Sequence, residues 1–125
     1  SSNPNGRQDW QTKIIIMNKL LLVLLMVLFS ESVYSQITVT HFNAEWNDPN
    51  KAEWVGDLTD CDITYIDIAK NPKLQIKHKV VVVPTIIIFQ DGEEVKRYQA
   101  DISFKMLATK NELQDKIDEI IMSNF

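Results

Sequence analysis

The residues best placed for chemistry stand just after a short strand pattern in the middle of the chain. There, Asn47 and Asn50 are three positions apart, with Asp48 and Pro49 between them. Asn and Asp are favoured N-cap residues and proline is tolerated in a first helical turn, so this stretch predicts the start of a helix. Amides held at that point could bind a carbonyl or an anionic group. Simple helix capping is the competing interpretation.

The single cysteine limits thiol chemistry. Cys61 has no intramolecular disulfide partner, and its neighbours Asp60 and Asp62 disfavour the thiolate. We interpret it as a half-buried structural residue, with an intermolecular disulfide or a redox-sensing thiol as the alternative. His41 and His78 are far apart and lack further ligands at metal-binding spacing. The sequence therefore predicts no metal site and no cofactor, and it favours a core position for His41.

Four strands are predicted around these residues. Alternating apolar and polar side chains, or an isoleucine-rich run, place them at residues 37–42, 63–68, 85–90 and 94–99. A helix between the first two strands makes them parallel through a right-handed crossover. Asp91 and Gly92 form a two-residue hairpin signal, so the last two strands should be antiparallel.

Three helices complete the predicted domain. The first runs from about Pro49 to Leu58, and the second is a short segment that follows Asn71. The third begins at a capping box formed by Thr109 and Glu112. The resulting order, β-α-β-α-β-β-α, predicts an α/β domain with a mixed four-stranded sheet and helices on both of its faces.

The N-terminal part of the chain carries a processing signature. A basic start at Met17 precedes an uncharged apolar run at residues 20–29, and small residues stand just before Gln36. This pattern predicts a signal peptide over residues 17–35, after an unstructured upstream extension over residues 1–16. The apolar run is about half the length that a spanning helix needs, so no stable membrane anchor is expected after cleavage.

The mature domain predicted from this processing, residues 36–125, is acidic. It has ten Lys and Arg residues against fifteen Asp and Glu residues, a net charge of −5. Because its basic residues are scattered, a nucleic-acid partner is not expected. Export predicts a periplasmic or secreted protein in an oxidising compartment. The sequence leaves the oligomeric state open.

Thr40 to Asn50 reads THFNAEWNDPN and resembles the active-site segment of a thioredoxin. Further matches follow in the family's order over the rest of the predicted domain: Asp67, Asn71 and Pro72, then Val83, Pro84 and Thr85, then Phe89 and the turn at Asp91 and Gly92. The resemblance implies a minimal thioredoxin fold with Pro84 as the family's cis-proline. It also implies that Val83 offers its backbone to an extended peptide.

Three departures from the family pattern bear on function. Asn47 and Asn50 occupy its two cysteine positions, His41 stands where the family has a buried aspartate, and the family's opening strand and helix are missing. Thiol-disulfide exchange needs an attacking thiolate and a resolving thiol, and an amide supplies neither. The resemblance therefore implies the scaffold without its dithiol chemistry.

We expect an exported, redox-inactive thioredoxin-like domain that binds extended polypeptide or a partner protein. The expected surface combines the degenerate motif and the cis-proline loop: Trp46, Asn47, Asp48, Pro49, Asn50, Val83, Pro84 and Thr85. The enzymatic alternative is a protein related to thiol-disulfide oxidoreductases that acts through Cys61 alone. A third hypothesis is an assembly module whose open sheet edge pairs with itself or with another chain.

Overall fold

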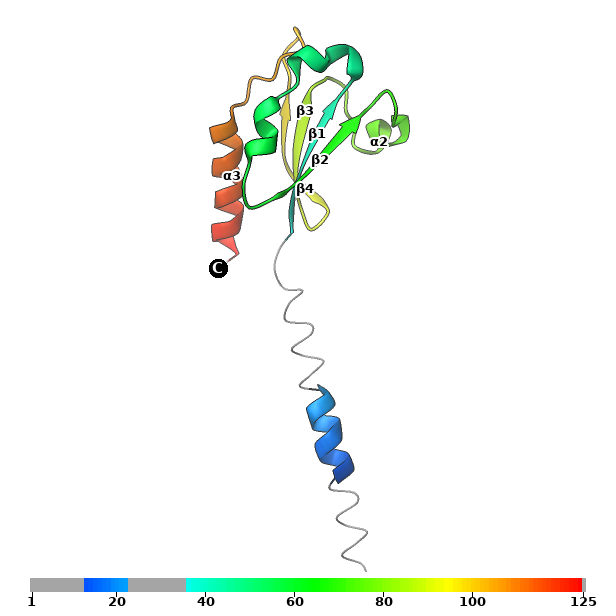
Figure 1. Cartoon of the computed structure of the whole chain (residues 1–125), viewed down its shortest axis with the longest axis vertical. Helices are drawn as coiled ribbons and strands as arrows, with labels where there is room; N and C mark the ends of the chain where they lie inside the picture. The colour runs from blue at the N-terminus through cyan, green and yellow to red at the C-terminus, as the bar shows by residue number, and fades with distance from the viewer. Residues whose placement is uncertain (1–12, 23–35, 125) are drawn as a thin grey trace, which may run out of the picture. The chain divides into compact units, whose positions relative to one another are not determined.

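The computed structural model describes residues 13–22 and 36–124 (Figure 1). Contacts divide the chain into two units, Ser1–Tyr34 and Ser35–Phe125. In the first unit, residues 13–22 form an exposed helix, and the rest of the predicted extension and signal peptide lies outside the described residues. The helix includes the end of the segment expected to be unstructured, because isoleucines at 14–16 extend the leader's apolar stretch toward the N-terminus. No helix among the described residues has both the length and the hydropathy needed to cross a bilayer.

Four strands of the second unit form one mixed sheet in the order β2-β1-β3-β4. Their bounds are β1 (Ile37–Asn43), β2 (Asp62–Asp67), β3 (Thr85–Gln90) and β4 (Glu93–Gln99). β1 is parallel to β2 and antiparallel to β3, and β3 is antiparallel to β4. The four predicted strands are therefore confirmed, each within one residue at either end. The predicted parallel direction of β1 and β2 and antiparallel direction of β3 and β4 are confirmed as well.

The segment after β1 differs from the predicted α-helix over 49–58. It forms two 3-10 helices, η2 (Glu45–Asn50) and η3 (Glu53–Asp57), separated by Lys51 at φ −61° and ψ 146° and Ala52 at φ −81° and ψ 88°. The N–H of Ala52 donates to Nε2 of His41 at 3.1 Å, so it is not available for a bond within a continuous helix. Three residues predicted to share an apolar face are nevertheless buried: Ala52, Val55 and Leu58.

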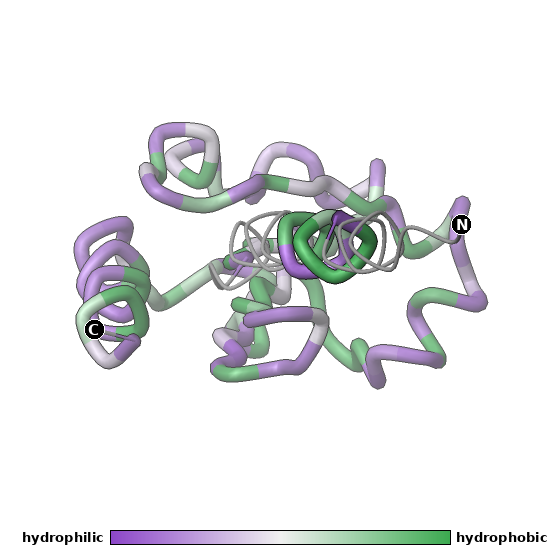
Figure 2. The backbone as a smooth tube through the Cα atoms, turned by 90° about the horizontal axis from the view of Figure 1, so that it is seen from below, coloured by the Kyte–Doolittle hydropathy of each residue, from purple (hydrophilic) through white to green (hydrophobic). Residues whose placement is uncertain are grey.

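The other two helices lie on opposite faces of the sheet, α2 (Pro72–Lys77) on one and α3 (Lys110–Ser123) on the other (Figure 1). The Thr109 side chain caps α3 by accepting the N–H of Glu112 at 3.2 Å, as the sequence predicts. Hydrophobic and hydrophilic residues alternate around the turns of α3 (Figure 2). Its buried residues are Leu113, Ile117 and Ile120.

The core is divided between the two faces of the sheet, because successive strand residues point to opposite sides. On one face, Ile37 and Val39 of β1 and Ile86 and Ile88 of β3 pack with η3 and α3. On the other face, a smaller cluster joins the strands to the segment that follows α2, and its buried members are Phe42, Val80, Val83 and Ile87. β1 and β3 are therefore covered on both faces, whereas β2 and β4 form the two edges of the sheet.

The turn between β3 and β4 is the predicted two-residue hairpin. Asp91 and Gly92 both have positive φ, 52° and 85°, which matches the twist of the flanking strands. The Asp91 carboxylate accepts the backbone N–H of Gln36 at 2.9 Å. This contact attaches the start of the domain to the hairpin.

Candidate functional site

The candidate site lies where β1 ends and η2 begins, and its centre is an amide cluster formed by Asn43, Asn47 and Asn50. Nδ2 of Asn47 donates to Oδ1 of Asn43 at 3.0 Å, and Oδ1 of Asn47 accepts from Nδ2 of Asn50 at 2.9 Å. Nδ2 of Asn43 in turn donates to the backbone oxygen of Asn47 at 3.2 Å. The three side chains therefore hold one another in place.

Asn47 also connects η2 to two loops that are distant in sequence. Its Nδ2 lies 3.3 Å from the carbonyl oxygens of both Val83 and Phe104. The residue is only 3% exposed. A buried amide is tolerated when its donors and acceptor are paired, and here they are paired within the protein. The hydrogen-bonding groups of Asn47, which the sequence offers as a ligand site, thus serve internal contacts.

The predicted cis-proline loop meets the amide cluster directly. The Val83–Pro84 peptide bond is cis and precedes β3. Val83, Pro84 and Thr85 are all buried, and Oγ1 of Thr85 donates to the carbonyl of Val82 at 2.6 Å. The structure therefore brings the two halves of the predicted site together. The carbonyl of Val83, expected to face a peptide, accepts its bond from Asn47.

An exposed aromatic pair, Trp46 and Phe104, lies beside this cluster. Trp46 is 63% exposed and Phe104 42% exposed. Their ring centroids are 5.2 Å apart with the rings perpendicular, a favourable edge-to-face contact. Asp48 and Pro49 are also exposed next to Trp46 in η2. Of the predicted site residues, these three offer side chains to solvent, while Asn50 is half-buried.

Sequence reasoning missed Phe104. The residue lies in the loop between β4 and α3, where Oδ1 of Asp101 accepts the backbone N–H groups of Ser103 and Lys105. Phe104 itself has a φ of 64°, a left-handed conformation that is costly for a residue with a Cβ. In the sequence, Phe104 is an aromatic residue in a segment without helical or strand periodicity, and that is its one distinguishing feature. Nothing local indicated its contact with Trp46.

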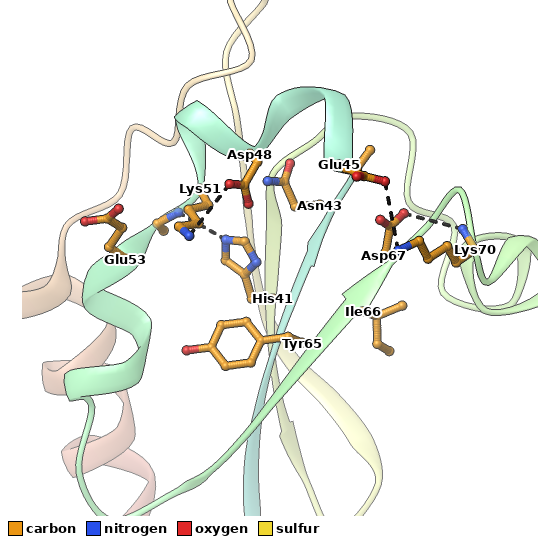
Figure 3. A pocket seen from close by; sticks show the side chains of 12 residues that line it. His41, Asn43, Glu45, Asp48, Lys51, Glu53, Tyr65, Ile66, Asp67 and Lys70 are labelled. Carbon is orange, nitrogen blue, oxygen red and sulfur yellow. Dashed lines mark hydrogen bonds and ion pairs between the residues drawn. The ribbon is translucent and has the colours of Figure 1, made fainter.

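A hollow of about 820 Å³ opens on the other side of η2, above β1 and β2 (Figure 3). His41 and Tyr65 form its floor, with ring centroids 5.7 Å apart. Burial lowers the pKa of His41, Lys51 lowers it further, and hydrogen bonding to the residue's own backbone opposes the shift. His41 is therefore neutral near pH 7, as its acceptor role toward Ala52 requires.

The hollow is acidic. Four carboxylates and two ammonium groups line it: Glu45, Asp48, Glu53, Asp67, Lys51 and Lys70. The Lys51 ammonium lies 3.8 Å from Asp48 and the Lys70 ammonium 3.9 Å from Glu45, and neither Glu53 nor Asp67 is in an ion pair in the part of the chain that the structure describes. Within the same residues, no group of three or more His, Cys, Asp or Glu side chains could hold a metal ion.

Cys61 lies at the opposite end of the sheet from the amide cluster. It precedes Asp62 at the start of β2, whereas Asn43 pairs with Asp67 at the far end of the same strand. At about 3.3 Å per residue, the two ends are roughly 16 Å apart. Burial raises the pKa of the Cys61 thiol, and Asp62 and Asp60 raise it further. The thiol is therefore protonated near pH 7 and remote from the candidate site.

Comparisons with known proteins point to one group of relatives. The thioredoxin of Staphylococcus haemolyticus (strain JCSC1435) is 34% identical over 76 residues, which cover 55% of this chain and 73% of the relative. The thioredoxin of Chlamydia trachomatis serovar D is 32% identical over 75 residues, covering 55% and 74%. Among solved structures, a mutant thioredoxin from Halobacterium salinarum NRC-1 has a TM-score of 0.53 at 27% identity, covering 67% of this chain and 74% of its own. No family model matches the chain.

Proposed function

This chain belongs to the thioredoxin-like family, and from that premise we propose that it is a redox-inactive member that binds extended polypeptide or a partner protein. The observation that carries the proposal is that a buried asparagine, Asn47, occupies a cysteine position of the family motif. The resemblance places an attacking cysteine there, and this chain has an amide whose Nδ2, with two N–H groups, lies within hydrogen-bond distance of Oδ1 of Asn43 and of the carbonyl oxygens of Val83 and Phe104. An amide cannot attack a disulfide.

The properties of Cys61 support the redox-inactive part of the proposal. The thiolate is the reactive form of cysteine, and burial together with two neighbouring aspartates raises the pKa of this thiol. The same residue lies just before the start of β2, and the two ends of that strand are roughly 16 Å apart by the rise per residue, with the amide cluster at the far end. A single protonated thiol at the other end of the sheet does not replace a dithiol at the candidate site.

The binding part of the proposal rests on the exposed aromatic pair. Trp46 and Phe104 present two large rings on the surface, and tryptophan is among the residues that contribute most to protein interfaces. Asp48 and Pro49 extend this docking surface along η2. The other predicted site residues support it from beneath: Asn47, Asn50, Val83, Pro84 and Thr85. Because Val83 is engaged with Asn47, we assign recognition to the rings and not to the Val83 carbonyl.

Backbone amide shifts in the ¹⁵N-labelled protein test the docking surface. We expect titration with an unfolded polypeptide, reduced α-lactalbumin, to shift the amides of Trp46, Asp48 and Phe104. Trp46→Ala should weaken this binding by about tenfold or more, as expected for a hot-spot residue. Met122→Ala is the matched control, since Met122 is an apolar residue 74% exposed near the end of α3, and it should bind like the wild type.

Two results would contradict the proposal. Amides around the aromatic pair that stay in place throughout the titration would remove polypeptide docking there. Insulin reduction that survives the substitution Cys61→Ser would show exchange chemistry without the only cysteine of the chain, and it would overturn redox inactivity.

A further inference from the structure

The two edges of the sheet differ in how they are protected against pairing with another strand. Along β4, Glu93, Glu94, Lys96 and Arg97 place charges on the edge, and its pairing with β3 is shifted at Ile88 and Phe89. Charges and register shifts of this kind discourage strand addition. The four central residues of β2, Ile63–Ile66, contain no charge, proline or glycine, and their register with β1 is regular.

The outer backbone groups of β2 follow from its pairing with β1. The N–H of Ile68 donates to the carbonyl of Asn43 at 2.9 Å and so points toward β1. Successive residues of a strand direct their N–H and C=O groups alternately to either side. The groups of Ile63, Tyr65 and Asp67 therefore point away from β1. In the sheet that the structure describes, no strand lies on that side.

The side chains of β2 are suited to a neighbouring strand. Tyr65 is 61% exposed, and Ile63 and Ile66 are half-buried on opposite faces of the sheet, in contact with the two core clusters. Isoleucine, threonine and tyrosine are the residue types that gain most from cross-strand contacts. A strand docked here would cover apolar surface on both faces.

The charges around β2 define the chemistry of its partner. Asp62 and Asp67 mark the two ends of the strand, roughly 16 Å apart by strand geometry, and neither is in an ion pair within the described part of the chain. Asp60 adds a negative charge before the strand, and the adjoining hollow, with four carboxylates against two ammonium groups, is negative overall. A complementary segment therefore carries basic residues at the positions that face Asp62 and Asp67.

We propose that the outer edge of β2 accepts an extended cationic segment of a partner protein as a fifth strand of the sheet. A second copy of this chain fits less well, because it would bring the acidic ends of two β2 strands to one seam. The edge of β2 shares no residue with the docking surface around Trp46, so this inference does not depend on the proposed function.

Two synthetic peptides test the proposal with the full chain. Both alternate valine and threonine, and they carry either two lysines or two glutamates spaced to face Asp62 and Asp67. We expect the lysine peptide to shift the amides of β2 and to leave those of β4 in place. The glutamate peptide should bind more weakly by a factor of about ten or more, and high salt should weaken the binding of the lysine peptide.

Backbone variants separate strand addition from simple charge attraction. Tyr65→Pro removes one outward N–H and is compatible with an edge strand, whereas Tyr65→Ala keeps that N–H and removes only the ring. We expect Tyr65→Pro to lose peptide binding and Tyr65→Ala to retain most of it. N-methylation of the lysine peptide gives a second measurement on the unchanged protein. Methyl groups on one alternate set of its amides should abolish binding, and methyl groups on the other set should leave it intact.

Three outcomes would overturn the proposal. Equal binding of the lysine and glutamate peptides would remove the charge complementarity. Equal tolerance of both N-methylation patterns would show that β2 does not pair with the peptide backbone. Light scattering that shows self-association, relieved by Tyr65→Pro, would assign the edge to a second copy of the chain instead.

Discussion

At the scale of single residues, His41 shows how burial sets the chemical state of a side chain. Its ring is enclosed beside Tyr65 and accepts the N–H of Ala52, a bond that requires an unprotonated Nε2. Protonation would both charge a buried group and break this bond. Protonation of His41 at low pH would therefore remove a hydrogen bond to Ala52, the residue that precedes η3.

A pH-dependent loss of stability follows from this arrangement. Burial lowers the pKa of His41 below 6.5, so at lower pH the unfolded chain takes up more protons than the folded one. The contribution of His41 to the free energy of unfolding is therefore fully present above about pH 6.5, the unfolded-state pKa. It is lost progressively as the pH falls through the folded-state pKa. We expect urea unfolding to give a lower free energy of unfolding at about pH 5.5 than at about pH 7.5.

The variant His41→Gln should flatten this pH dependence. The matched variant is His78→Gln, because burial and the neighbouring Lys77 and Arg97 also lower the pKa of His78, against an opposing effect of Glu94. Each variant should remove part of the slope. An unchanged slope in His41→Gln would show that its ring does not titrate with unfolding.

Local sequence predicted some residue environments and missed others. The neighbours Asp60 and Asp62 indicated an unreactive Cys61, and the raised pKa agrees, although burial is the larger cause. The role of Asn47 was not predictable in this way. Its partners Val83 and Phe104 stand 36 and 57 positions away, and such contacts leave no periodic pattern near the residue.

At the scale of elements, strands and turns followed from sequence more directly than the first helix did. The alternating residues of β1 and the Asp91–Gly92 pair each indicate a structure that depends on neighbouring residues alone. The structure has both the strand and the two-residue hairpin turn. The segment after β1 carries helical spacing but forms η2 and η3. The imidazole that takes up the Ala52 N–H comes from a neighbouring strand, so helical periodicity alone could not reveal it.

The two described glycines of the domain allow a matched test of turn geometry. Gly92 has a φ of 85° with open space where a Cβ would be, whereas a Cβ at Gly56 would lie 3.2 Å from Oη of Tyr65. We expect Gly92→Ala to lower the free energy of unfolding by about 1 kcal/mol through backbone strain alone. Gly56→Ala should cost about 0.5 kcal/mol or less, because the exposed Tyr65 ring can move.

Urea denaturation of the two variants beside the wild type measures this difference. A larger loss in Gly56→Ala than in Gly92→Ala would show that the contact with Tyr65 outweighs the backbone conformation of the hairpin.

At the scale of the whole molecule, the relative directions of two strand pairs could be predicted because each connection has few solutions. A short crossover makes β1 and β2 parallel, and a two-residue turn makes β3 and β4 antiparallel neighbours. The pairing of β1 with β3 then completes the mixed sheet. What the elements could not predict is the loop between β4 and α3, whose place beside Trp46 depends on the assembled fold.

Export of the domain is a prediction that concerns the whole chain. If residues 17–35 are a signal peptide, expression in a bacterial host should yield periplasmic or secreted protein whose first residue is Gln36, as measured by intact-mass spectrometry. Leu24→Arg places a charge in the apolar run and should leave the precursor uncleaved in the cytoplasm. Cleavage of both forms, or of neither, would contradict the prediction.

The amide at position 47 has a consequence for how this sequence can evolve. Cysteine has one weak S–H donor where Asn47 has two N–H groups, so a single change to cysteine would leave the buried Val83 carbonyl without its partner. The loss would be about 1–3 kcal/mol, a large fraction of the stability of a small domain. Mutational routes toward dithiol chemistry therefore pass through an unstable intermediate, unless Asn43, Asn50 and the Phe104 loop change first.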